Sequence, residues 1–274
     1  MKKILTVSAL TLLITACGGP NMPNAVTSVS GTVVEMVPPA PTATEYTLTT
    51  KAWTGGAGTV NGQMDSSVTK IKLGDLAASG AFTATLPAPA DADLAVGGNI
   101  NVDPSCTGQY QVSEPAARIG MLGVTVDVAD ATKDGTIAPV AATIKDTTNN
   151  AGTGVLSLNV QAGFLMYADR AVNVSGSQTC NRTSGGFTYP ETVKFDLNLV
   201  KGWNRVTFKD EGSITYTNGA VTAAQETLSI TSGSLPSDKW LWGGTAIVGM
   251  NAGKGLNVAT TPAALLDKAQ GLLR

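Results

Sequence analysis

The chain has 274 residues, of which 14% are charged, with a formal net charge of −2 and no histidine. Histidine is the usual general base near neutral pH and the commonest nitrogen ligand of zinc and copper, so a Ser-His-Asp triad, a zincin-type helix and a type-2 copper site are excluded. No cluster of Lys and Arg follows the amino-terminal segment, which argues against a nucleic acid partner.

Gly, Thr, Ala, Ser and Val dominate the composition, as is typical of strands and tight turns. We therefore predict an all-β fold, an antiparallel β-sandwich or barrel-like architecture of two packed β-rich halves with a short C-terminal amphipathic helix. The predicted organisation is a signal peptide over 1–16, a lipidated cysteine and flexible tether over 17–30, a β-sandwich-like domain over 31–105, a second β-rich domain over 106–250 and a tail with the helix over 251–274.

The amino-terminal segment resembles the export signal of bacterial lipoproteins. Lys2 and Lys3 precede an apolar run from Ile4 to Ile14, which is too short to span a bilayer comfortably. The run ends in Ile14-Thr15-Ala16-Cys17, which is similar to a lipobox. The resemblance implies cleavage before Cys17, a diacylglycerol on its sulfur and an acylated amino terminus, and therefore a permanent membrane anchor.

The same resemblance implies a location in the cell envelope. Gly18 stands where some bacteria place an aspartate that retains lipoproteins at the inner membrane, so the outer membrane or the cell surface is expected. The expected partners are the membrane, through the lipid, and other envelope proteins or a surface polysaccharide.

Short strands are predicted in the first half of the chain at 26–37, 45–53, 68–73 and 81–86. Within this half, Ser30-Gly31-Thr32-Val33 and the segment from Gly80 to Pro87 resemble the transthyretin-like and carboxypeptidase-regulatory β-sandwich modules. That resemblance implies a passive module without catalysis.

Longer strands are predicted after Cys106. The segments 118–127 and 154–170 are apolar enough for core strands, and 193–199 alternates apolar with polar residues as a half-buried antiparallel strand does. Asn218-Gly219 predicts a hairpin, because this pair accepts the positive φ angles of a type I′ turn.

Two cysteines remain if Cys17 is lipidated. They are too few for a thiolate zinc site or an iron–sulfur cluster. Outside the cytoplasm, Cys106 and Cys180 are expected to form one structural disulfide. The alternative is a reactive thiol pair, which no Cys-x-x-Cys spacing supports.

One segment resembles the first half of an EF-hand calcium loop. Asp130, Thr132 and Asp134 place oxygen ligands at positions 1, 3 and 5, and Gly135 follows at position 6. Position 12 is Ala141, so the bidentate carboxylate is missing and calcium would need a further acid such as Asp127. The alternative is a simple turn between two strands. No other cofactor is predicted.

Trp240 and Trp242 lie two residues apart, so on a strand their indoles share one face. If that face is exposed, the pair forms a flat platform for stacking sugar rings; if it is buried, the two indoles are a core pair.

The carboxylates near the long predicted strands show no spacing that distinguishes them from surface charge: Glu191, Asp196, Asp210, Glu211 and Glu226. No glycosidase pair is therefore expected, and we predict that the protein is not an enzyme.

Near the carboxyl end, Thr261 and Pro262 are suited to begin the amphipathic helix, whose apolar stripe needs a cover. That cover is the protein's own sheet, a partner subunit or the membrane surface. The predicted function is a non-catalytic envelope lipoprotein with a structural or adaptor role, and the alternative is a saccharide-binding module that uses Trp240 and Trp242.

Overall fold

The structure is a computed structural model that describes residues 25–37, 44–96, 106–147, 152–184, 187–218 and 220–243. It confirms the all-β prediction, because strands make up 72% of these residues and the only helical elements among them are the 3₁₀ turns η1 (Asp91–Asp93) and η2 (Ala131–Lys133). The predicted signal peptide, Cys17, most of the predicted tether and the predicted C-terminal helix lie outside the described residues. Within these residues, no helix is long and apolar enough to cross a bilayer.

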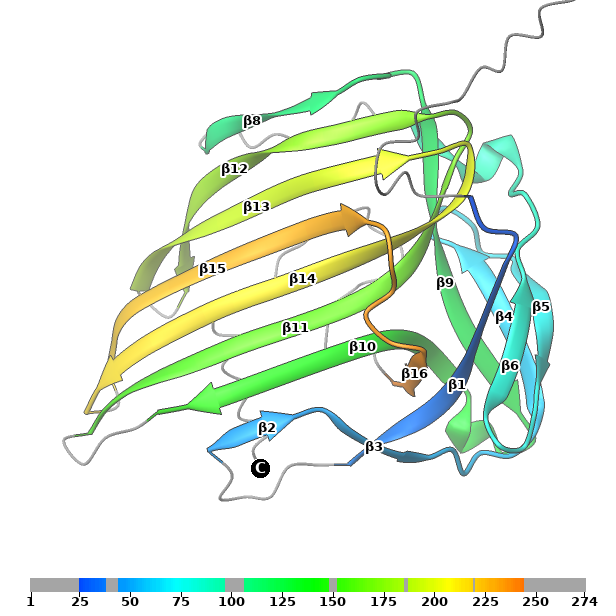
Figure 1. The fold of residues 1–274 in the computed structure, drawn as a ribbon, viewed down its shortest axis with the longest axis horizontal. Coiled ribbons are helices and arrows are strands. Elements are labelled where there is room, and N and C mark those ends of the chain that lie inside the picture. Colours follow the sequence, from blue (N-terminus) through cyan, green and yellow to red (C-terminus); the bar gives the residue numbers. More distant parts are fainter. Residues whose placement is uncertain are drawn as a thin grey trace, which may run out of the picture.

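Seven strands close into a ring at one end of the molecule (Figure 1). Each is hydrogen-bonded to the next, and the last pairs with the first. In order around the ring they are β1 (Ser28–Val37), β6 (Ala81–Thr85), β5 (Lys70–Leu76), β4 (Gly58–Met64), β9 (Arg118–Val128), β10 (Gly135–Asp146) and β16 (Lys239–Trp242). Short strands β3 (Thr49–Ala52) and β7 (Ala95–Val96) extend the ring by pairing with β1 and β9.

A second, larger sheet extends from the ring, and we call it the long sheet (Figure 1). It begins with β2 (Glu45–Thr47) and β10 and continues through β11 (Thr153–Ala168), β14 (Gly202–Thr217), β15 (Ala220–Ser232), β13 (Phe187–Leu199), β12 (Val172–Ser184) and β8 (Thr107–Val112). The end of this sheet that meets the ring, at Ala168 and Gly202, is its base. The opposite end, at Thr153 and Thr217, forms its tips.

Side chains alternate between the two faces of the long sheet, as the two-residue period of a strand requires. On β14, Val206 and Phe208 belong to a large apolar cluster, whereas Thr207 and Lys209 point to the other face. We call the face that carries the apolar cluster the inner face. A separate apolar cluster fills the ring, with Val33, Val60 and Val126 fully buried.

Among the described strands, two pairings are parallel, β13 with β15 and β1 with β16, and the other pairings are antiparallel. The sheet is also continuous across the boundary predicted at 105/106, because β4 pairs with β9 along its whole length. The two segments that carry the transthyretin-like resemblance are neighbours, with Ser30 opposite Thr83 and Gly31 opposite Phe82.

Two local predictions are confirmed. The disulfide between Cys106 and Cys180 joins the start of β8 to β12, with the two Cα atoms 4.4 Å apart. The hairpin at Asn218 joins β14 to β15, and Asn218 has a φ of 51°, the positive value that the predicted turn requires.

Candidate functional site

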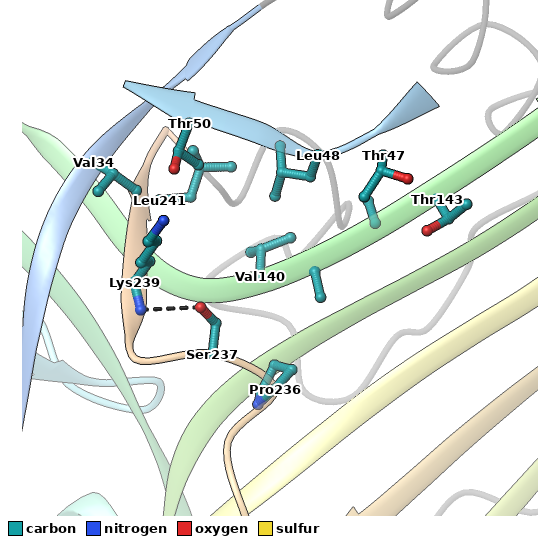
Figure 2. Close-up of a pocket in the computed structure, with 12 residues that line it drawn as sticks. Val34, Thr47, Leu48, Thr50, Val140, Thr143, Pro236, Ser237, Lys239 and Leu241 are labelled. Carbon is teal, nitrogen blue, oxygen red and sulfur yellow. Dashed lines mark hydrogen bonds between the residues drawn. The ribbon is translucent and has the colours of Figure 1, made fainter. Parts of the chain in front are cut away.

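A pocket of about 220 Å³ opens where β10 passes from one partner strand to another (Figure 2). β10 pairs with β16 at residues 137–139 and with β2 at residues 143–145. Between these two ladders, on the same edge of β10, the Leu48 nitrogen donates to the Ala142 oxygen at 2.8 Å. β3 and the loop before β16 close the remaining sides.

The pocket has an apolar floor and a polar rim. The floor consists of buried aliphatic side chains from three strands: Val34, Val140, Ala142 and Leu241. The rim carries the hydroxyls of Thr47, Thr50, Thr143 and Ser237. Lys239 is the charged residue of the lining, and in Figure 2 its side chain extends along β16 toward Leu241 and Thr50. Such a lining suits a small ligand that has both a hydrocarbon surface and polar groups.

A buried ion cluster holds β1, β3 and η2 together. Glu35 is only 5% exposed, and its carboxylate accepts bonds from Lys133 Nζ at 2.8 Å and from the backbone nitrogen of Thr54 at 3.2 Å, with Lys51 Nζ at 3.4 Å. Burial would raise the pKa of Glu35, but these bonds outweigh it and lower the pKa from 4.5 to about 2. Lys133 also lies over the ring of Trp242, 4.8 Å from its centroid. The cluster was not predicted from the sequence.

Of the two interpretations of Trp240 and Trp242, the structure agrees with the core pair and not with the exposed platform. The two indoles do share a face of β16, but that face packs against the core of the ring. Trp240 is 1% exposed and packs edge-on against Phe82 with ring centroids 5.3 Å apart, and Trp242 lies against Trp53. Trp240 is therefore part of the ring core and the partly buried Trp242 packs against it, so the two indoles do not form an exposed platform for a sugar ring.

The segment that resembles a calcium loop forms a turn around η2. Asp130 accepts bonds from the nitrogen and hydroxyl of Thr132, and Asp134 accepts one from the nitrogen of Val128 at 2.7 Å. Asp127, the acid proposed to complete the shell, instead contacts Lys70 and Asn61. Across the described ranges no three metal-ligating side chains gather, so the three calcium candidates bond to their own turn.

Three carboxylates that the sequence could not distinguish from surface charge are buried on the inner face. Glu191 and Glu226 lie opposite each other on β13 and β15, each 2% exposed, and Asp210 lies on the neighbouring β14. Arg182 Nε donates to Glu191 at 2.8 Å. The alternation of side chains along β15 could have predicted the position of Glu226, because Glu226 is two residues from Leu228 and four from Ile230, which both point to the inner face.

Tyr189 is buried beside this acidic group, two residues before Glu191 on β13. Burial raises the pKa of its phenol, and the charges of Glu226 and Glu191 raise it further. Its hydroxyl has no hydrogen-bond partner among the described residues. The phenol of Tyr189 therefore keeps its proton at neutral pH.

Comparison with known proteins gives no relative: no protein-family model, curated protein or solved structure matches this chain.

Proposed function

We propose that the protein is a non-catalytic lipoprotein of the cell envelope, anchored through Cys17, that holds the long sheet away from the membrane as a structural or adaptor component. The lipobox-like segment supports the anchor. The position at which the described chain begins supports the proposed orientation of the long sheet, with its base toward the membrane.

The observation that carries the proposal is the bridge between Val26 and Trp203. The Val26 nitrogen donates to the Trp203 oxygen at 2.8 Å, so the described chain begins beside the first residues of β14. This is the base of the long sheet. The eight residue-to-residue steps from Cys17 to Ala25 span at most about 28 Å, which keeps the base near the lipid.

The tips then lie on the far side of the molecule. β14 runs from the base at Gly202 to the tips at Thr217. At about 3.3 Å per residue, that places the turn at Asn218 roughly 45 to 50 Å from the base. A rigid sheet of this length presents its polar outer face and its edge strand β8 to other envelope components.

The test places one epitope tag at a time in the full-length lipidated protein, reconstituted in vesicles. A tag in the turn at Asn218 is expected to bind antibody freely, whereas a tag in the base loop at Arg170 is expected to bind less on vesicles than in detergent. Equal access at both positions, or the reverse order, contradicts the orientation. A Cys17→Ser variant that remains in the membrane fraction contradicts the anchor.

A further inference from the structure

We propose that the pocket between β10 and β16 binds a single sugar acid, a hydroxyl-bearing ring with one carboxylate. This goes beyond the proposed function, which needs no ligand. It also differs from the aromatic platform in place and in chemistry, since no tryptophan lines this pocket.

The size of the pocket selects a small ligand. Its volume of about 220 Å³ equals roughly seven water molecules at about 30 Å³ each. It is below the range of about 300 to 1,000 Å³ that is usual for drug-sized ligands. One ring with its substituents is of this size, and a long acyl chain is not.

The charge of the lining selects an anion. Lys239 is its charged residue, and no ion pair joins the Lys239 ammonium to a described carboxylate. Asp238 is adjacent in sequence, but it is not part of the lining. A carboxylate on the ligand supplies the missing counter-charge.

The hydroxyls of the rim select a ligand with hydroxyl groups of its own. The side chains of Thr47, Thr50 and Thr143 make no hydrogen bond to a described residue, so each can donate and accept toward a ligand. Below them, the floor of Val34, Val140, Ala142 and Leu241 provides an apolar surface for the C–H face of a sugar ring.

The experiment titrates full-length protein in detergent with glucuronate and galacturonate, and in parallel with glucose, acetate and octanoate, by calorimetry. Uronate is expected to bind at least tenfold more tightly than either glucose or acetate, because only uronate uses both the ammonium and the hydroxyls. Absence of uronate binding, or octanoate binding that equals it, overturns the proposal.

Three variants separate the contributions. Lys239→Gln is expected to weaken uronate binding about tenfold and to leave glucose unchanged, whereas Thr143→Val is expected to weaken both sugars. Lys145→Gln is the matched control, because Lys145 lies on the same strand, is exposed and pairs with Glu45 outside the pocket. Uronate affinity that is unchanged in Lys239→Gln contradicts the assignment. The tag experiment on vesicles is independent of these results, so the two proposals fail separately.

Discussion

The Glu35 carboxylate accepts a 2.8 Å bond from the Lys133 ammonium, which lies 98 residues further along the chain. This contact joins β1 to η2, in the turn that follows β9. Because Glu35 is buried and Lys133 is half-buried, little water screens the pair.

Removal of this charge is expected to destabilise the protein. The pKa of Glu35 falls from 4.5 to about 2 on folding, which corresponds to about 3 kcal/mol of stability. Since the folded-state pKa is the lower one, this stability is present above about pH 4.5 and is lost as the pH falls toward 2. Urea unfolding of Glu35→Gln at pH 7 should show the loss, and the difference from wild type should shrink at pH 3.

The control for this prediction is Glu45→Gln. Glu45 is exposed, and its pair with Lys145 is long, at 4.0 Å, so the free energy of unfolding should change by less than about 0.5 kcal/mol. If Glu35→Gln behaves like this control at pH 7, the cluster does not stabilise the fold.

Reduction of the disulfide is expected to cost a large part of the stability. Cys106 and Cys180 are 74 residues apart, and closure of such a loop reduces the entropy of the unfolded chain by about 4 kcal/mol in free energy. Thermal unfolding of a Cys106→Ser, Cys180→Ser double variant should show a lower midpoint. Addition of reductant should lower the midpoint of wild type and leave the variant unchanged, and a midpoint of wild type that reductant does not move would argue against the bond.

Tyr189→Phe is expected to be neutral or stabilising at pH 7, although Tyr189 is 2% exposed. Its hydroxyl has no partner within the described part of the chain, so removal of the hydroxyl relieves a desolvation cost without breaking a bond. Urea unfolding measures this change, and a loss of more than about 1 kcal/mol would reveal a hydrogen bond.

The pH dependence of the same variant has a defined sign. Because folding raises the pKa of Tyr189, the folded state favours the neutral phenol. The stability that depends on this neutral phenol is fully present below its ordinary pKa of 10 and is lost as the pH rises above that value. Wild type should therefore lose stability above pH 10 more steeply than Tyr189→Phe does. Parallel curves would contradict the assignment.

Gly176→Ala is expected to weaken the attachment of β8. Gly176 has a φ of 121°, and a Cβ there would collide with the backbone oxygen of Gln109 on β8. We expect a loss of about 1 to 3 kcal/mol in urea unfolding, with faster amide exchange along β8. Gly123→Ala is the control, since the nearest atom to its Cβ is 3.5 Å away; equal losses in the two variants would contradict the steric argument.

Local patterns predicted several strands and the turn at Asn218, because alternation and turn chemistry act over a few residues, but β4, β10 and β12 were not predicted. The alternation at 193–199 matches the inward and outward sides of β13, and Asn218 turns as expected. The pocket and the Glu35 cluster could not be predicted in the same way. Both depend on contacts between distant segments, such as Glu35 with Lys133, and no short-range spacing records them.

The position of Trp240 illustrates the same limit. The sequence placed the two indoles on one face of a strand, which the structure bears out, but four residues carry too little pattern to say which face is covered. That depends on the insertion of β16 between β1 and β10, which sequence spacing does not reveal.

The parallel pairing of β1 with β16 has a consequence for how the molecule is made. Thr32 lies opposite Lys239, so the ring cannot close until both β1, near the start of the chain, and β16, near its end, have been made. A nascent chain emerges amino terminus first, so it cannot close the ring of strands until almost all of it has been synthesised. Contacts so remote in sequence form slowly, so the ring is expected to close late in folding, after the strands that precede β16 have been made.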